Sequence, residues 1–287
     1  MKKKFIYLFV AILAVVTITS QAQVKQMTMK TALSSVDVLI MMAGSGSCTI
    51  DWGDGSEIET KQLHPHSYGT VNFSPQECSY LHNYPDTTER TIIITGENIT
   101  LLDCRGIVIS SLDVSRNTAL QYLDLLSGII TIDEGKININ SSSGLLTSLD
   151  ISKNIKLKRL NCTNNLLTSI DVSNNKALNA LYCNGNQLTN LDISNNVILT
   201  LLYCAGNQIT SLDVSKNTRL TDLSCGNNKL DASALNSLFG TLHRNRGKKS
   251  IYLDNSSETE SSDKRIATNK RWTVLNEEIW KLGIFGL

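Results

Sequence analysis

The stretch LYCNGNQLTNLDIS, from Leu181 to Ser194, sets the pattern of this chain. Leu181 and Cys183 alternate with Tyr182, the period-two pattern of a strand that has one buried face. Asn186 and Leu188 follow at fixed offsets, and the same framework returns in the sequence just before this stretch and just after it. One such unit cannot bury its own leucines, whereas stacked units share a continuous core. The stretch therefore predicts a repeat protein.

The repeats occupy roughly residues 97–230. Four copies follow one another without a gap, and a fifth and a partial sixth come before them; the copies begin at Ile99 (partial), Ile109, Leu146, Leu167, Leu188 and Ile209. The step from Asp113 to Asp150 is longer than the regular step from Asp150 to Asp171, so a segment is inserted between two copies. Isoleucines alternate within this insertion, at about 127–142, which predicts a β-hairpin or a long loop that projects from the solenoid.

The repeat resembles the leucine-rich-repeat family. Its pattern L-x-x-L-x-L-x-x-N-x-L matches Leu178, Leu181, Cys183, Asn186 and Leu188, with cysteine in place of the third leucine. The 21-residue period with a recurring cysteine is similar to the cysteine-ladder variety found in internalin-type bacterial surface proteins. The resemblance implies a right-handed solenoid with a parallel strand face, a surface or adhesion role, and a protein partner, which includes host proteins.

The regions on either side of the repeats differ in composition. TIDWGDGSEIE, from Thr49 to Glu59, runs from a strand into a Gly-Asp-Gly turn and resembles the PKD-like immunoglobulin-type β-sandwich, which we assign to residues 23–96. Asp231 is a candidate N-cap for a helix that opens a small α/β cap over residues 231–276. The fold expected is therefore mainly β. The last residues, 277–287, have the sequence EEIWKLGIFGL, which no motif explains.

The N-terminus predicts export. Lys2, Lys3 and Lys4 precede an apolar run from Phe5 to Val16, and a small-residue cleavage site ends at Ala22, so residues 1–22 are expected to be a signal peptide. The mature chain would then be secreted, periplasmic or at the cell surface, with no membrane span. The formal charge of the whole chain is only +1, which gives no basic footprint for nucleic acid.

No motif indicates an enzyme, a cofactor or a metal. The recurring D-[VI]-S-x-N loosely resembles the start of a calcium loop, but it lacks the glycine and the distant glutamate, so we interpret it as a turn. His64, His66 and His82 are weak candidates for metal ligands, and a surface loop is the preferred interpretation. The carboxylates of the Trp-Gly-Asp-Gly turn are assigned a structural role rather than acid–base catalysis.

The ladder cysteines and asparagines are expected to be structural. A cysteine at this position faces the core, where it behaves as a small apolar residue, and Leu125 fills the same position in one copy. Parallel side chains oppose the disulfide twist, so the ladder should hold free thiols. Cys48 and Cys78, outside the ladder, form a candidate disulfide. The structural set is Cys104, Cys162, Cys183, Cys204, Cys225, Asn165, Asn186, Asn207 and Asn228.

The strand face of the solenoid is the candidate binding site. Residues one and three positions before the ladder cysteine, here called column −1 and column −3, point away from the core, as does column +1 after it. Tyrosine and arginine are common at protein interfaces, and tyrosine also suits stacking on sugars. The candidate residues are Tyr122, Arg159, Asn161, Tyr182, Asn184 and Tyr203. The expected ligand is a protein, and the alternative is a glycan bound by an accessory protein of the bacterial surface.

Overall fold

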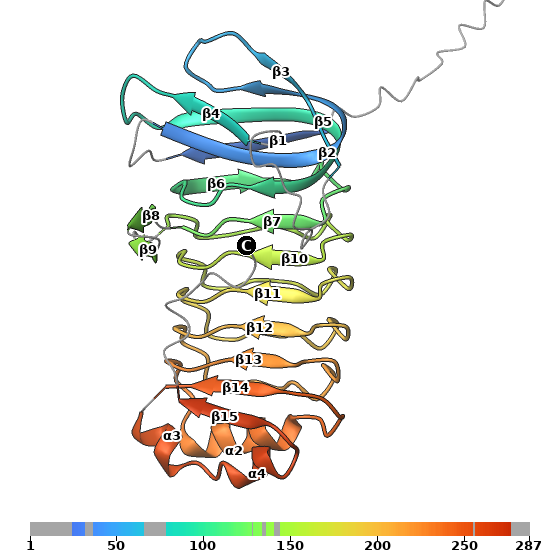
Figure 1. Ribbon diagram of the computed structural model, residues 1–287, viewed down its shortest axis with the longest axis vertical. Helices are drawn as coiled ribbons and strands as arrows, with labels where there is room; N and C mark the ends of the chain where they lie inside the picture. Colours follow the sequence, from blue (N-terminus) through green and yellow to red (C-terminus); the bar gives the residue numbers. More distant parts are fainter. Residues whose placement is uncertain are drawn as a thin grey trace, which may run out of the picture.

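The computed structural model describes residues 25–31, 37–65, 79–127, 129–133, 136–140, 144–254 and 256–276. The proposed signal peptide, Cys78, His66 and the segment 277–287 lie outside these ranges. The molecule is an elongated stack with the repeats in its middle (Figure 1). No helix among the described residues is long and apolar enough to cross a membrane.

The first part of the stack is antiparallel. Its strands are β1 (Gln26–Thr31), β2 (Asp37–Asp51), β3 (Glu59–Gln62), β4 (Ser79–Asn83), β5 (Arg90–Asp103) and β6 (Ile109–Asp113). The long strand β2 pairs with β3, β4 and β5, while β1 lies between β5 and β6. Strand β5 continues through residue 96, where the sequence places a domain boundary, and its last residues pair in parallel with the first repeat strand. Antiparallel strands are therefore present before the repeats, and they join the same sheet.

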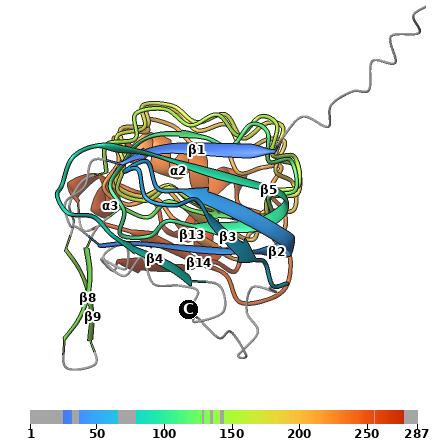
Figure 2. The same ribbon diagram turned by 90° about the horizontal axis from the view of Figure 1, so that it is seen from above.

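The repeats form a parallel ladder of very short strands. These are β7 (Tyr122–Asp124), β10 (Arg159–Asn161), β11 (Ala180–Tyr182), β12 (Leu201–Tyr203) and β13 (Asp222–Ser224). The register follows the repeat period, so Leu160, Leu181 and Leu202 are direct neighbours across the ladder. Figure 2, viewed along the stack, shows the repeats superposed as successive coils. The prediction of a mainly β chain with a parallel strand face is confirmed, and the arrangement is consistent with a solenoid of leucine-rich repeats.

One continuous hydrophobic core runs through the stack. It extends from Met27 in β1 through the ladder leucines and cysteines to Trp272 near the end. The ladder leucines Leu160, Leu181 and Leu202 are completely buried. Burial of each such side chain stabilises the fold by roughly 1.5–3 kcal/mol before the entropy of ordering is counted. Because each repeat buries its apolar side chains against the next repeat, the stability of one repeat depends on its neighbours.

Two ladders of asparagine side chains hold the turns of the coils. In the first ladder, Asn186 Nδ2 donates to the carbonyls of Cys162 (2.9 Å) and Cys183 (3.1 Å), and its Oδ1 accepts from Leu167 N at 3.0 Å. In the second, Asn196 Nδ2 donates to the carbonyls of Val172 and Asn175, both at 3.0 Å. Each asparagine thus joins its own repeat to the one before it. These bonds satisfy buried backbone groups that the short strands do not reach.

The D-[VI]-S-x-N motif forms turns. Its aspartate accepts a hydrogen bond from the backbone N–H two residues on, as Asp171 does from Ser173 at 2.9 Å, and its asparagine belongs to the second ladder. The other aspartates repeat the same bond; they are Asp113, Asp150, Asp192 and Asp213. The motif therefore closes the coil on the side away from the strand ladder.

Left-handed backbone recurs two residues after each ladder cysteine. Gly185 and Gly206 have φ of 61° and 67°, and Asn164 and Asn227 have φ of 58° and 52° at the equivalent positions. Glycine and asparagine tolerate this conformation best. The choice of residue at this position is thus dictated by the turn that leads out of each strand.

The insertion between the repeats contains an antiparallel pair. Strands β8 (Ile129–Asp133) and β9 (Lys136–Asn140) form a separate two-stranded sheet. Ile130 pairs with Ile139 and Ile132 with Ile137, so the alternating isoleucines that mark the insertion lie opposite one another. The pair projects sideways from the stack (Figures 1 and 2).

The Trp-Gly-Asp-Gly segment forms a loop rather than a two-residue hairpin turn. Strands β2 and β3 pair only from Ile50 and Glu59, which leaves a loop between them. Gly53 has φ of 76°, and a side chain there would collide with the Thr91 carbonyl. Trp52 lies buried below the loop, its Nε1 donating to Glu59 at 2.7 Å and its ring stacked on His82 at 4.7 Å. These contacts anchor the tryptophan at the start of the loop. The immunoglobulin-type identity of the region stays a resemblance.

His82 has a local structural role. Besides stacking on Trp52, its Nε2 lies 2.8 Å from Asp54 Oδ2. Hydrogen bonds from Ser56 and His82 hold the pKa of Asp54 well below its usual range. No group of three or more histidines, cysteines or carboxylates among the described residues has the arrangement of a metal site.

The C-terminal end closes the stack with helices and two further parallel strands. These are α2 (Ala232–Thr241), β14 (Ser250–Leu253), α3 (Ser257–Ser261), α4 (Arg265–Thr268) and β15 (Thr273–Asn276). Asp231 caps α2 by accepting from Ala234 N at 2.7 Å. Arg271 adopts a φ of 68°, so the turn before Trp272 keeps a left-handed form that favours glycine. Lys249 is buried, with its ammonium bonded to the carbonyls of His243, Asn245 and Lys270.

The described cysteines are buried free thiols. They are Cys48, Cys104, Cys162, Cys183, Cys204 and Cys225. Cys48 is a buried free thiol in this structure. Cys78 lies outside the described residues, so the pairing of the two stays a prediction. Burial raises the pKa of Cys162 and of Cys204 to about 12.

The ladder thiols should not react in the native protein. At pH 8 a thiol of pKa about 12 has roughly a thousandth of the thiolate of a free cysteine, and thiolate is the reactive form. We expect Ellman's reagent to label no ladder cysteine in native protein and all of them in guanidinium chloride. Mass spectrometry of native protein alkylated with iodoacetamide checks the sites. Rapid native labelling of Cys183 or Cys204 would contradict the inward placement.

Candidate binding face of the parallel sheet

The outer columns of the strand ladder are the candidate site. Strand pairing places Asn161, Tyr182 and Tyr203 side by side in column −1. Arg159 and Tyr122 are adjacent in column −3. Five of the six candidate residues therefore lie on four neighbouring strands, β7, β10, β11 and β12. Asn184 follows Cys183 at the end of the same strand.

The two tyrosines form a stacked pair. Their ring centroids are 5.1 Å apart with the planes 19° from parallel. The Arg159 guanidinium lies over the Tyr182 ring, 4.4 Å from its centroid. This is the geometry of a cation–π interaction. Burial raises the pKa of both Tyr182 and Tyr203. The result is a compact Arg–Tyr–Tyr row across β10, β11 and β12.

The tyrosine pair is not the open surface that strand alternation alone predicts. Only 3% of Tyr182 and 7% of Tyr203 is exposed. Column −3 is more accessible, because Tyr122, Arg159 and Leu201 are half-buried. Local alternation tells which way a side chain points, but it does not tell what lies over it. The accessible part of the face is therefore column −3.

Asn161 and Asn184 are engaged in backbone hydrogen bonds. Asn161 Oδ1 accepts from Thr163 N at 3.1 Å, and Asn184 Oδ1 accepts from Ala205 N at 2.9 Å. Both side chains are buried. These two candidates hold the ends of their strands, so their contribution to a ligand site would be indirect.

Acidic groups occupy the first rungs of column −1, which the sequence does not single out. Asp103 and Asp124 are paired neighbours and are both buried. Arg105 forms an ion pair with Asp103 at 2.7 Å, whereas its Nε is 3.9 Å from Asp124. Burial, together with the charge of Asp103, raises the pKa of Asp124 to about 6. The periodicity places these residues in the column but does not reveal that two carboxylates are buried together.

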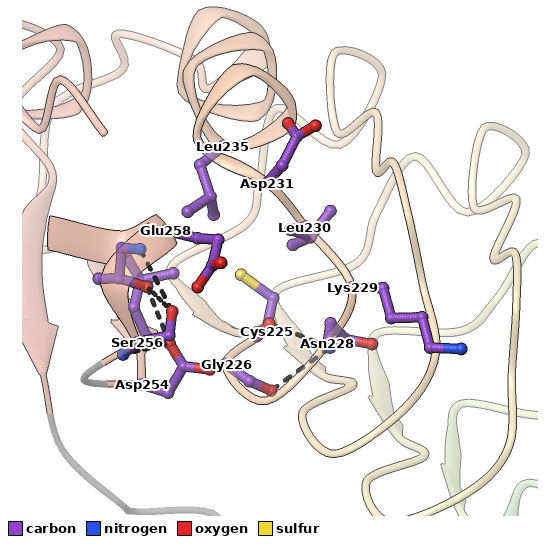
Figure 3. Close-up of a pocket in the computed structure, with 12 residues that line it drawn as sticks. Cys225, Gly226, Asn228, Lys229, Leu230, Asp231, Leu235, Asp254, Ser256 and Glu258 are labelled. Atoms are coloured by element: carbon purple, nitrogen blue, oxygen red, sulfur yellow. Dashed lines mark hydrogen bonds between the residues drawn. The ribbon is translucent and has the colours of Figure 1, made fainter. Parts of the chain in front are cut away.

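A cavity of about 310 Å³ lies where the last repeat meets the cap. Figure 3 shows Asp254 at its wall, beside Ser256. Asp254 accepts from Asn227 N at 2.6 Å and from Thr259 Oγ1 at 2.8 Å. These bonds hold the cap against the last coil, so we interpret the cavity as a gap in the packing between the two. The sequence gives no signal for it.

Comparisons with known proteins find likeness in structure but not in sequence. No protein-family model matches the chain, and no curated protein matches it. The functional domain of InlJ from Listeria monocytogenes, described as including a cysteine ladder, is 22% identical over 62% of this chain and 53% of that one, with a TM-score of 0.38.

Two further internalins of Listeria monocytogenes are similar to the chain at the same level. InlF is 19% identical over 64% of this chain and 83% of that one, with a TM-score of 0.32. Internalin C2 is 20% identical over 61% and 80%, with a TM-score of 0.39. The match to the InlJ domain spans about half of that chain, as its covered share of 53% shows.

Proposed function

We propose that the protein is an exported, non-enzymatic recognition protein that binds a protein ligand on the outer face of its parallel ladder. In this proposal residues 1–22 are a signal peptide, and the mature chain is secreted or held at the cell surface. The antiparallel region, which resembles a PKD-like domain, shields the first coil of the solenoid.

The observation that carries the proposal is the contrast between the two sides of the ladder. The inner positions repeat the same residues, as Leu160, Leu181 and Leu202 illustrate. Column −3 differs on every rung; it contains Tyr122, Arg159, Ala180, Leu201 and Asp222. Packing fixes the inner side, whereas the outer side is free to vary on a rigid frame. A rigid frame with a variable surface suits recognition of a macromolecule.

Arginine and tyrosine on column −3 favour a protein over a glycan. Both are enriched among the residues that dominate protein interfaces. The glycan alternative depends on sugar stacking against Tyr182 and Tyr203, and their low exposure leaves little ring surface for it. We therefore expect the ligand to contact the accessible strip around Arg159 and Leu201.

The proposal is tested by a screen followed by a charge reversal. The mature chain, residues 23–287, is applied to an array of purified extracellular proteins and to a glycan array. For a protein hit, we expect Arg159→Glu to weaken binding at least tenfold, because the arginine lies in the centre of the strip. Ile155→Lys is the matched control, since Ile155 is exposed on another side of the repeat. Binding that both variants retain, or a specific glycan hit alone, would refute the proposal.

A further inference from the structure

The cap carries exposed basic side chains that do not belong to the strand ladder. They come from two segments, the loop 243–249 after α2 and the turn 269–272 between α4 and β15. Arg244, Arg246, Lys248 and Arg271 are exposed and Lys270 is half-buried; these residues are here called the basic patch. The formal charge of the whole chain is only +1, so the patch is a local excess of positive charge at one end of the stack (Figure 1).

The buried ammonium of Lys249 holds the two segments together. It donates to the carbonyls of His243 (3.2 Å) and Asn245 (2.7 Å) in the loop and of Lys270 (2.9 Å) in the turn. An ammonium group has three N–H donors, so these carbonyls use all of them. The loop is also fastened to the last repeat, where His243 Nε2 lies 2.8 Å from the Leu220 carbonyl. Lys249 thus fixes the backbone that carries the basic patch.

Like charges are gathered in the basic patch without a carboxylate to neutralise them. Burial and the charge of Arg244 lower the pKa of Lys270. Burial and the charge of Arg271 lower the pKa of Lys249. Among the described residues, no carboxylate forms an ion pair with any member of the patch. Because like charges repel and destabilise the compact state, an anion that binds here removes a repulsion present in the free protein.

Arg271 is held in a backbone conformation that arginine rarely adopts. Its φ of 68° lies in the left-handed region, which glycine adopts without strain. Its side chain is exposed, so burial in the core does not account for arginine at this position. Strained residues persist where the surrounding structure holds them, and they gather at functional sites. The strain and the charge therefore point to the same surface.

The composition of the cap surface indicates which anion the patch fits. Proteins that lie on a membrane add apolar side chains that enter the lipid, and proteins that bind single-stranded nucleic acid add aromatic rings that stack on bases. The large apolar and aromatic side chains that are exposed among the described residues all lie outside the cap. Cations spread over two segments can instead contact successive groups of a flexible polyanion and release its counterions.

We propose that the basic patch binds a linear acidic polysaccharide through its sulfate or carboxylate groups. The patch is separate from the strand face of the repeats, so the chain can hold a polysaccharide at its cap while the repeats contact a protein. The inference does not depend on the proposed function, because the two surfaces share no residue and either can fail alone.

Heparin, a sulfated polysaccharide, is the probe for the mature chain, residues 23–287. Its dissociation constant is measured by fluorescence anisotropy at about 50 mM and about 200 mM NaCl, a range over which polyanion contacts weaken steeply. We expect the affinity of the wild type to fall at least tenfold between the two, and R244S/R246S to weaken binding at least tenfold at the lower salt concentration. K153S/K156S is the matched control, because it removes the same charge from exposed lysines of a repeat turn; it should change binding less than twofold.

Competing polymers test the class of ligand. Dextran sulfate or polygalacturonate should displace heparin, whereas neutral dextran should not. Absence of heparin binding at the lower salt concentration would overturn the proposal, as would equal losses in the two double variants, since only the overall charge would then matter. Tighter binding to phosphatidylglycerol vesicles or to oligo(dT) than to heparin would overturn the choice of a polysaccharide.

Arg271→Gly gives a second readout that a purely structural role would not produce. Glycine relieves the left-handed strain and removes one cation of the patch. We therefore expect the urea midpoint of unfolding to rise while the affinity for heparin falls at least threefold. A variant that binds heparin as tightly as the wild type, or that loses stability, would show that this arginine is not kept for an anion and would overturn its place in the basic patch.

Discussion

Asn186→Ala is expected to lower the free energy of unfolding by about 2–4 kcal/mol, because one buried backbone N–H left unsatisfied costs roughly 1–3 kcal/mol and each further hydrogen bond lost costs roughly 0.5–1.5 kcal/mol. The side chain donates to the carbonyls of Cys162 and Cys183 and accepts from Leu167 N. Its Nδ2 also donates to the Asn184 carbonyl at 3.2 Å. Alanine leaves Leu167 N without this partner, whereas the carbonyls of Cys162 and Cys183 keep their bonds from Asn165 and Asn207. The effect should exceed that of most single substitutions, because one side chain joins two repeats.

Urea unfolding followed by circular dichroism measures this loss. The matched control is Asn195→Ala, the same substitution at an exposed position in the next repeat turn, for which we expect a change within about 0.5 kcal/mol. Asn196→Ala should fall between the two, since the Asn196 side chain makes two such bonds and the Asn186 side chain makes four. Equal effects at all three positions would show that the asparagine ladders do not hold the coils together.

The sequence predicts the ladder well because the repeat period and the strand period agree. Every repeat places its leucine, cysteine and asparagine at the same offset, and the strands pair at those offsets. The inward direction of Cys183 also follows from alternation alone. Both features follow from the alternation within one strand and from the similarity of successive repeats, and both of these can be read from the sequence.

Other features depend on contacts between segments that the repeat pattern does not relate. The passage of β5 across residue 96 requires β1 and β2 to pair with it. Lys249 is buried, and its ammonium is satisfied by three carbonyls that lie far apart from the repeat pattern, in the cap. None of these arrangements has a local signature.

The paired carboxylates lead to the second large prediction: Asp124→Asn should stabilise the protein at pH 8. Asp124 is buried beside Asp103, and Arg105 bonds mainly to Asp103. Its pKa is raised to about 6 by burial and by the charge of Asp103. The ionised form is therefore disfavoured in the fold, at roughly 1.4 kcal/mol per pKa unit. Asparagine removes this charge, and a gain of about 1–3 kcal/mol is expected.

Asparagine fits this position because the neighbouring rung already has it. Asp124 accepts from Leu126 N at 3.1 Å, and Asn161, its partner on the next strand, accepts from Thr163 N at the same distance. The substitution therefore keeps the hydrogen bond that closes the end of the strand. The gain is electrostatic rather than a result of repacking.

The pH dependence of the stability difference tests whether the gain comes from removing the charge of Asp124. Because the folded-state pKa of Asp124 lies above its unfolded value, the folded protein binds the proton more tightly between about pH 4 and pH 6. Its contribution to stability is thus greatest below pH 4 and is lost as pH rises through 6. The turn carboxylates, such as Asp171, have lowered pKa values and act in the opposite direction at lower pH. They are present in both proteins and cancel in the comparison.

Urea unfolding of the two proteins at a series of pH values from 4 to 8 gives the difference directly. We expect Asp124→Asn to exceed the wild type at pH 8 and to match it near pH 4, while Asp171→Asn shows no gain at pH 8. A variant that is less stable than the wild type at pH 8 would show that Arg105 compensates the Asp124 charge fully. A gain that does not change between pH 4 and pH 8 would mean that ionisation of this carboxylate is not its source. Either result would remove the buried carboxylate pair as a destabilising element of the strand face.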